Sequence, residues 1–334
     1  MRVLWLLPLA FCLQFVPPAL AEGDLQKIVV ISDLNGRYGS TGYHPRIAKA
    51  VARIVELAPD LVISTGDMVA GQRPSPKLKR DELEAMWANF HQQVRIPLEQ
   101  AGIPLVSTPG NHDASGYPGY ELERKVYADY HAAHPPAFTP DKEGRFPYYF
   151  STVINDLLLI SLDATRASPL DEDQHQWLKR QLCGSEQKTM FVFGHLPLQA
   201  ITRGRERDVI SDPRLENLLA ATGVAAYLSG HHHAFYPGSR MGIDMLSIGN
   251  LGGNQRRLVG TSQTTGFSFA LIEIDAQKKV QISAYAGTDF SEAIDITRLP
   301  PYLGAGTRRL NRRDLVDDGI ADDSATHASV CTDS

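Results

Sequence analysis

Residues 103–113 read Ile-Pro-Leu-Val-Ser-Thr-Pro-Gly-Asn-His-Asp, an apolar run that passes through Pro109 and Gly110 into three consecutive polar residues. The apolar part predicts a buried β-strand, which the proline and glycine end. Asn, Asp and Gly are also ordinary turn residues, so this stretch alone is compatible with a plain loop. Loops at strand ends are, however, where functional side chains concentrate.

The same form recurs elsewhere in the chain, as a short apolar run followed by Gly or Ser and then by Asp, Asn or His. The other segments are residues 28–35, 61–67, 190–195 and 225–233. Carboxylate, amide and imidazole groups are the side chains that bind divalent metals in proteins. Five strand ends that all deliver such groups indicate one metal site assembled from distant segments.

The composition is that of an ordinary soluble globular protein, with 334 residues, 43% hydrophobic and 21% charged. This length suits one large α/β domain or two small ones. The net charge of −5 does not favour nucleic acid as a partner, because nucleic-acid binding calls for a basic surface.

The N-terminus has the pattern of an export signal. Arg2 precedes a largely apolar stretch over residues 3–16, and Ala19-Leu20-Ala21 fits a cleavage site. The apolar stretch is short and contains Pro8 and Gln14, so we expect no stable membrane insertion. We therefore expect residues 1–21 to be a cleaved signal peptide and the mature protein to be periplasmic or secreted. Two cysteines then remain, Cys183 and Cys331, and the sequence leaves their pairing open.

The order of predicted elements indicates an α/β fold with a single core. The first half alternates strands and helices, and the second half mixes a hairpin with further strands and helices. Predicted strands are residues 27–32, 61–64, 103–108, 148–153, 157–162, 189–193, 225–228, 245–248, 266–274 and 280–285. Predicted helices are residues 45–58, 81–101 with a bend at Pro97, 121–134, 171–182 and 213–221. We expect one domain over residues 22–303 and a polar, loosely ordered tail over 304–334.

The candidate ligands exceed the need of one metal ion, which takes about four to six donors. They are Asp33, Asp67, Asn111, His195, His231 and His233, with Asn35 as a weaker candidate. Two ions sharing Asp67, about 3.5–4 Å apart, account for the set. His112 is then free to act as a general acid, with Asp113 holding its ring. On an extended segment His231 and His233 point the same way, with His232 opposite.

Taken together, these motifs resemble those of the calcineurin-like metallophosphoesterase superfamily. The motifs are Asp33-x-Asn35, Gly66-Asp67, Gly110-Asn111-His112-Asp113, Gly194-His195 and Gly230-His231-His232-His233. The resemblance implies a four-layer α-β-β-α sandwich, with mixed sheets flanked by helices and two divalent metals (Mn, Fe, Zn or Mg) at the strand ends. It also implies a role for each group. Asp33 and His233 would bind the first metal, Asp67 would bridge, and Asn111, His195 and His231 would bind the second. A metal-bridging hydroxide would attack phosphorus, and His112 would protonate the leaving group.

One position departs from this pattern, because the superfamily usually has His where this chain has Asn35. The purple acid phosphatase branch supplies a Tyr three residues after the second Asp, and here that position is Ala70. An amide oxygen is a weaker ligand than imidazole for Zn²⁺ or Fe and suits Mn²⁺, Mg²⁺ or Ca²⁺. Tyr38 and Tyr43 lie nearby in the sequence as further candidates.

An anionic substrate needs donors beyond the metals. The main candidates besides Asn111 are Arg37, Arg203 and Arg205. Further candidates are Arg46, Arg166 and the backbone amides of residues 249–254. Our first hypothesis is an exported phosphoesterase acting on small phosphomonoesters or phosphodiesters. The alternative is a non-catalytic module that binds a phosphorylated ligand and has a degenerate first metal site. The sequence does not indicate the oligomeric state.

Overall fold

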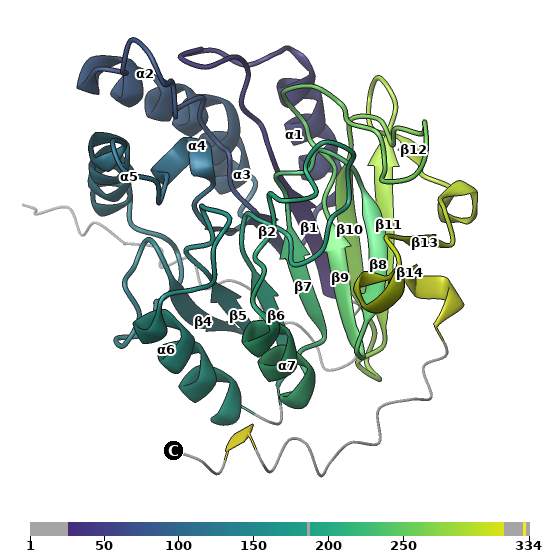
Figure 1. Ribbon diagram of the computed structural model, residues 1–334. Coiled ribbons are helices and arrows are strands. Elements are labelled where there is room, and N and C mark those ends of the chain that lie inside the picture. Colours follow the sequence, from purple (N-terminus) through teal and green to yellow (C-terminus); the bar gives the residue numbers. More distant parts are fainter. Residues whose placement is uncertain (1–25, 186–187, 317–329, 332–334) are drawn as a thin grey trace, which may run out of the picture.

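The computed structural model describes residues 26–185, 188–316 and 330–331, and the predicted signal peptide lies outside them. The described residues form two β-sheets that face each other, with helices on both outer faces (Figure 1). The predicted four-layer α/β sandwich is confirmed.

The first sheet has the strand order β12-β11-β10-β1-β2-β3. Strands β1, β2 and β3 are parallel, and β10 pairs antiparallel with β1. In β1, Ile28 and Val30 pack between the sheets while Val29 and Ile31 pack against the helices, so the last four positions of the strand are all apolar. The strands are β1 (Gln26–Ile31), β2 (Leu61–Ser64), β3 (Leu105–Ser107), β10 (Phe269–Ile274), β11 (Val280–Ala286) and β12 (Glu292–Ala293).

The second sheet has the order β13-β14-β8-β9-β7-β6-β5-β4. It contains the predicted hairpin, β4 with β5, followed by parallel pairing from β5 through β6 and β7 to β9. The sequence did not predict β8, because Pro237 and Gly238 are poor strand residues. The strands are β4 (Phe150–Ile154), β5 (Leu157–Ser161), β6 (Thr189–Phe193), β7 (Ala226–Ser229), β8 (Tyr236–Arg240), β9 (Ile243–Ser247), β13 (Tyr302–Leu303) and β14 (Leu310–Arg312).

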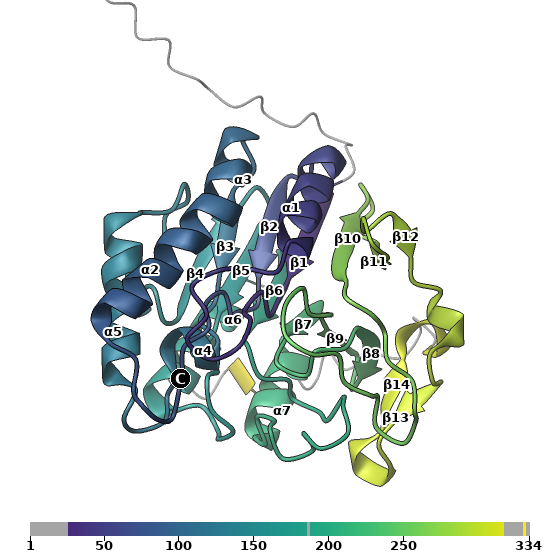
Figure 2. The same cartoon turned by 90° about the horizontal axis from the view of Figure 1, so that it is seen from above.

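Helices α1, α2, α3 and α5 pack on the first sheet, and α6 and α7 pack on the second (Figures 1 and 2). Their bounds are α1 (Arg46–Leu57), α2 (Arg80–Phe90), α3 (Ile96–Gln100), α5 (Glu121–Ala133), α6 (Glu172–Cys183) and α7 (Pro213–Ala221). A short helix, α4 (Asn111–Ala114), follows β3. Three 3₁₀ turns, Ile296–Arg298, Gly306–Arg308 and Arg313–Leu315, lie in the C-terminal part of the described chain.

The helix predicted over residues 81–101 is interrupted before Pro97. Residues His91–Arg95 form a π-helical segment between α2 and α3. Proline lacks an N–H and its ring crowds the preceding turn, which explains why the wider turn occurs immediately before it.

The tail behaves differently from the expectation of loose order over its whole length. Strand β14 pairs with β13 and with β8, and Leu310 is buried. The domain therefore continues beyond residue 303 to residue 316, because an apolar Leu within a charged segment completes the edge of the second sheet. The expectation for residues 317–329 lies outside the described part of the chain.

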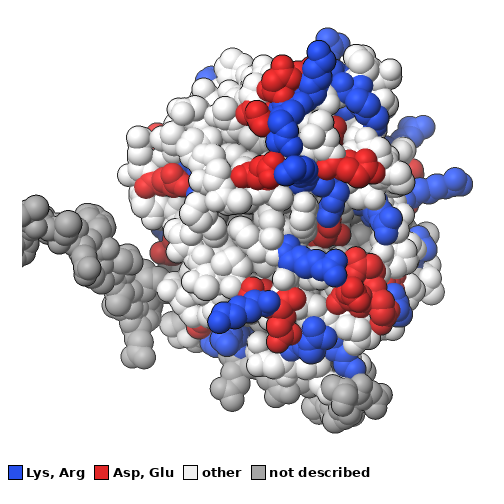
Figure 3. Space-filling view, turned by 90° about the vertical axis from the view of Figure 1, so that its left-hand side faces the viewer, with Lys and Arg blue, Asp and Glu red and all other residues white. Residues whose placement is uncertain are grey.

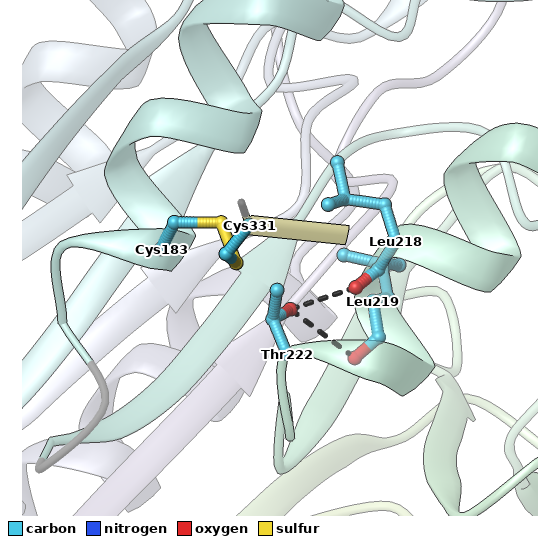
Figure 4. The surroundings of a disulfide bond; sticks show 5 residues. All are labelled: Cys183, Leu218, Leu219, Thr222 and Cys331. Atoms are coloured by element: carbon cyan, nitrogen blue, oxygen red, sulfur yellow. Dashed lines mark hydrogen bonds between the residues drawn. A yellow bond between two sulfur atoms is a disulfide. The ribbon is translucent and has the colours of Figure 1, made fainter. Parts of the chain in front are cut away.

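Cys183 and Cys331 form a disulfide, which settles the pairing that the sequence left open. Cys183 ends α6, and the close-up shows the bond beside the C-terminal end of α7 (Figure 4). There the Thr222 hydroxyl donates to the carbonyls of Leu218 and Leu219. The disulfide thus connects the C-terminal region to the helical layer of the second sheet.

The surface over α2, α5 and α6 carries charges of both signs. Figure 3 shows Lys and Arg side chains interleaved with Asp and Glu on this face. Arg80 bridges α2 to Asp129 of α5, and Arg180 of α6 pairs with Glu143. None of the helices in the described residues has the length and apolar character of a transmembrane span.

Candidate metal centre

The predicted ligands meet at one end of the sandwich, where the carboxyl ends of strands from both sheets converge. Asp33 and Asp67 follow the parallel strands β1 and β2 of the first sheet. His195 and the segment His231–His233 follow β6 and β7 of the second sheet. The side chains therefore face one another across the seam between the sheets.

Asp33 and His233 form one corner of the centre. His233 Nε2 lies 3.1 Å from Asp33 Oδ1, yet this oxygen is buried without a hydrogen-bond partner among the described residues. Burial alone would raise the pKa of Asp33, but His233 and His195 hold that pKa well below its usual range. A carboxylate oxygen and an imidazole nitrogen are both common ligands of divalent cations, so this close pair is a candidate corner of a metal site.

Asp67 occupies the middle of the centre. Its Oδ2 lies 3.2 Å from His195 Nε2 and 3.7 Å from His112 Nε2, and its Oδ1 accepts the His112 backbone N–H at 2.9 Å. His195 Nε2 is also 4.0 Å from Asp33 Oδ1. Asp67 thus contacts both His195 and His112, and His195 in turn lies beside Asp33.

His195 and His231 form the other corner with Asp67. One ligand atom from each of these three residues lies within 4.8 Å of the others, and all three residues are buried. His195 donates through Nδ1 to the carbonyl of Thr65, which turns its Nε2 toward His231 Nδ1, 3.2 Å away. Burial alone would lower the pKa of His195, but Asp67 and Asp33 raise it to about 9.

Asn111 completes this corner. Its Nδ2 donates to Gln72 Oε1 at 2.7 Å, and its Oδ1 is buried without a partner in the described part of the chain. Buried polar atoms usually have partners, so the free oxygens of Asn111 and Asp33 need an explanation. A divalent cation would supply it, since the donor set of carboxylates, imidazoles and one amide suits such an ion.

The ligand residues adopt an uncommon backbone conformation. Asp33, Asp67, His231 and His233 have φ of 52°, 57°, 63° and 53°. The extended segment predicted for His231 and His233 is therefore wrong, because β7 ends at Ser229 and both histidines lie in left-handed turns. This conformation is costly for non-glycine residues, and such strain clusters at functional sites.

Two motif glycines allow the loops to approach this closely. A Cβ on Gly110 would collide with Asp67, and one on Gly230 would collide with Ser32 and Asp33. The glycines that precede Asn111 and His231 are thus required by the packing of one ligand loop on another.

His112 stands at the rim of the centre with its side chain 18% exposed. Its Nδ1 contacts the Gly71 carbonyl at 2.8 Å, so Nδ1 carries a hydrogen and Nε2 is left facing the centre. Asp113 does not hold this ring, which corrects the sequence-based prediction. Its carboxylate instead accepts the backbone N–H groups of Val69 and Gly110, because α4 turns the side chain back toward its own N-terminus.

Asn35 and His232 support the centre rather than facing a metal with a ligand atom. Asn35 Nδ2 lies 3.4 Å from Asp67 Oδ2, so the amide donates to the shared carboxylate. The prediction of Asn35 as an oxygen ligand is not met in this orientation. His232 accepts from the Ile201 backbone and reaches the Asp208 carbonyl, and burial lowers its pKa to about 4.

The predicted arginines differ in their position. Arg205 pairs with Asp208 at 2.7 Å, and Asp208 Oδ2 lies 3.9 Å from His231 Nε2. Arg37 and Arg203 are exposed. The other candidates lie away from the ligands, since Arg46 stacks on Phe267 and Arg166 lines a cleft beside α5 and α6.

Residues 249–254, whose amides were one candidate for contacting a phosphate, instead position His233 and the strand-end loop of Asp33. The N–H groups of Leu251 and Gly252 donate to the carbonyls of Ser32 and Asp33. The Asn254 carbonyl contacts His233 Nδ1 at 2.7 Å. The segment thereby fixes His233 with Nε2 toward Asp33. Tyr43 is also structural, because its hydroxyl donates to the Met68 carbonyl.

Sequence reasoning missed two residues, Gln72 and Arg256. Gln72 turns the Asn111 amide so that its oxygen is free, and Gln72 is itself held by Ser115 and Glu123. Arg256 is partly buried and donates to the His231 carbonyl. It also interacts electrostatically with Asp33 and Asp67. Nothing in the sequence around Gln72 indicates a role at the centre. Arg256, in contrast, belongs to the basic pair Arg256-Arg257, which follows a Gly-rich segment at a strand end.

Comparison with known proteins agrees with this geometry. The sequence profile of the calcineurin-like phosphoesterases matches residues 26–235. The chain belongs to the calcineurin-like phosphoesterase family. The predicted resemblance is confirmed, and the five ligand loops of this family member all lie within the matched region.

Individual relatives cover parts of the chain. Serine/threonine-protein phosphatase CPPED1 of Mus musculus is 26% identical over 208 residues, which are 58% of this chain and 60% of the mouse protein. This calcineurin-like chain therefore spans less than two thirds of that relative. Tartrate-resistant acid phosphatase type 5 of Rattus norvegicus is 43% identical over 61 residues, 18% of each chain. The solved purple acid phosphatase PPD1 of yellow lupin has a TM-score of 0.60 at 16% identity, covering 81% of this chain and 53% of its own, and so shares the fold.

Proposed function

We propose that this protein is an exported phosphoesterase that hydrolyses small phosphomonoesters or phosphodiesters at a centre for two divalent metal ions. The observation that carries the proposal is the convergence of Asp67, His195 and His231 beside the free buried oxygens of Asp33 and Asn111. Asp33, His233 and Asp67 would hold one ion, and Asp67, Asn111, His195 and His231 the other. When bound, such a pair supplies an activated water and neutralises charge on the phosphoryl oxygens.

The protein's own groups account for substrate orientation and proton transfer. Arg256 is fixed to the His231 carbonyl through Nη1, which leaves its other guanidinium donors for a phosphoryl oxygen. His112 Nε2 lies beside Asp67, with Nδ1 bonded to the Gly71 carbonyl. We propose that protonated Nε2 donates its hydrogen to the leaving oxygen as the phosphorus–oxygen bond breaks.

The test combines metal analysis with turnover. Purified protein is loaded with Mn²⁺, Fe, Zn²⁺ or Mg²⁺, its metal content is measured, and it is assayed with aryl and alkyl monoesters and diesters. We expect two ions per chain and hydrolysis of at least one ester class. A dinuclear preparation that is inert toward every ester would contradict the proposal.

Asn35 favours a second candidate, a phospho-ligand-binding module with a weak first metal site, because its amide donates to Asp67. One ion or none, with tight phosphate-ester binding and no turnover, would support this module. Asn35→His separates the two candidates further. In the enzyme we expect it to tighten or change the first metal without abolishing turnover, since imidazole is a better ligand than an amide.

The proposed export rests on the N-terminal pattern and on the Cys183–Cys331 disulfide, which suits an oxidising compartment. Expression of the full chain in a bacterium, followed by fractionation and N-terminal sequencing, tests it. We expect mature protein outside the cytoplasm that begins at Glu22. Uncleaved protein retained in the cytoplasm would contradict export.

A further inference from the structure

An exposed aromatic ring stands beside the proposed proton donor. The centroids of the Tyr38 and His112 rings are 5.0 Å apart, and the ring planes are inclined by 33°. Tyr38 is 53% exposed. An aromatic side chain that leaves so much of its surface in water, directly at a reaction centre, is available to contact a ligand.

Two consecutive carbonyl groups hold the loop of Tyr38 and the ring of His112 next to each other. The Ala70 carbonyl accepts the backbone N–H of Gly39, next to Tyr38, at 2.7 Å. The following carbonyl, that of Gly71, accepts from the His112 ring. One short stretch after β2 therefore holds both the loop of Tyr38 and the imidazole of His112.

The turn at this loop is tight and well supported. Gly39 has φ of 82°, and Ser40 N–H donates to the Arg37 carbonyl at 2.9 Å. A Cβ on Gly39 would also collide with the guanidinium of Arg73. The backbone around Tyr38 is therefore anchored, which keeps the base of its side chain beside His112.

This arrangement separates the two ends of a substrate. A general acid must reach the leaving oxygen, so the group attached to that oxygen lies on the side of His112 and hence of Tyr38. The cationic group Arg256 lies instead beside His231. The phosphoryl group would thus lie near a cationic side chain, and the leaving group near an aromatic one.

We propose that Tyr38 forms a leaving-group subsite that selects phosphoesters with a flat aromatic leaving group over those with an aliphatic one. The inference rests on the proposed phosphoesterase function and specifies its substrate class. The phenol ring is exposed beside His112, so that an aryl or heteroaryl ring can stack on it, whereas an alkyl chain gains less from the same surface.

Binding of two phosphonates, which cannot be hydrolysed at phosphorus–carbon, tests the subsite directly. Calorimetry on the metal-loaded protein compares phenylphosphonate with methylphosphonate for wild type, Tyr38→Ala and Tyr38→Phe. We expect Tyr38→Ala to weaken phenylphosphonate by about tenfold and to leave methylphosphonate unchanged, while Tyr38→Phe behaves as wild type. Tyr302→Ala is the matched control, because Tyr302 is similarly exposed, at 45%, on the distant strand β13.

Turnover supplies the second readout. We expect Tyr38→Ala to lower kcat/KM for phenyl phosphate relative to an alkyl phosphate, by the factor seen in binding. Equal losses on both phosphonates, or none on either, would overturn the subsite while leaving a hydrolysing wild type and its proposed function intact. A wild type that binds neither phosphonate and hydrolyses no ester would instead overturn the proposed function and the subsite together.

Discussion

At the scale of single residues, His112 is the clearest case of a role decided by a hydrogen bond. The Gly71 carbonyl occupies Nδ1, so only Nε2 can exchange a proton with a substrate. Asp113, its neighbour in the sequence, is buried and serves the backbone, and burial together with Asp67 raises its pKa to about 7. Proton transfer at this centre therefore depends on a main-chain acceptor.

Replacing His112 tests this role. We expect His112→Asn to lower kcat by about 10²–10⁴-fold for alkyl esters, which need a protonated leaving group, and far less for nitrophenyl esters, whose leaving group is already stable. Metal content should not change, because His112 lies outside the ligand set. The slope of rate against leaving-group basicity is the measurement, and equal losses for all esters would contradict the role of proton donor.

Gln72 is a positioning residue whose effect should appear in metal affinity. Gln72→Leu removes the acceptor that turns the Asn111 amide, so we expect about a 10–100-fold weaker second metal. Competition with a chelator measures this affinity without any substrate. Ser115→Ala is the matched control, since it removes another hydrogen bond of Gln72 and leaves Asn111 untouched. An unchanged metal affinity in Gln72→Leu would show that Asn111 orients itself.

At the scale of elements, the loop after β2 connects the centre to α5. Glu123 of α5 accepts the backbone N–H of Gln72 at 2.8 Å, and Gln72 in turn holds Asn111. Burial raises the pKa of Glu123 to about 7 from 4.5. The loop that orients a ligand is thus packed against a carboxyl group that favours its protonated form.

This pKa shift predicts a pH dependence of stability. The pKa of Glu123 is higher in the folded than in the unfolded protein. Protonated Glu123 therefore contributes its full share of the folding free energy below about pH 4.5, and this share is lost as the pH rises through about 7. We expect a loss of about 1–2 kcal/mol, because solvent screens part of the effect. Urea unfolding measures the free energy of unfolding at about pH 5 and about pH 8. Between these pH values it should decrease less for Glu123→Gln than for wild type. The exposed Glu121→Gln serves as control, and parallel pH profiles for wild type and Glu123→Gln would refute the prediction.

At the scale of the whole molecule, the disulfide joins parts of the chain that are 148 residues apart. A cross-link that closes so long a loop restricts the unfolded chain strongly. It also holds Cys331 beside α6 and the C-terminal end of α7 (Figure 4).

Breaking this bond should affect stability and spare the centre. We expect Cys183→Ser and Cys331→Ser each to lower the free energy of unfolding by about 2–5 kcal/mol, and the double variant to lose no more than either single one. Bound metal and kcat should remain as in wild type. Additive losses, or loss of metal in one variant only, would mean that the cysteines act separately.

The sequence alone determined the fold class and the ligand types. Apolar runs that end in Gly or Ser and then in Asp, Asn or His can be recognised without coordinates, because strand burial and metal chemistry both act through residue type. Such patterns use only neighbouring residues, which explains why strands β8 and β14 were not predicted. Pro237 and Gly238 argue against a strand, and Leu310 stands alone in a charged segment, yet pairing across the sheet outweighs these local preferences.

Only the tertiary structure decided which groups face the centre and which support it. Asn35 and Asp113 have the chemistry of functional residues, but their hydrogen bonds go to Asp67 and to the backbone. Gln72 and Arg256, which belong to no motif, reach the centre through contacts with Asn111 and His231. The physical reason is that a side chain's role depends on its orientation and on its partners, which come from loops far apart in the sequence.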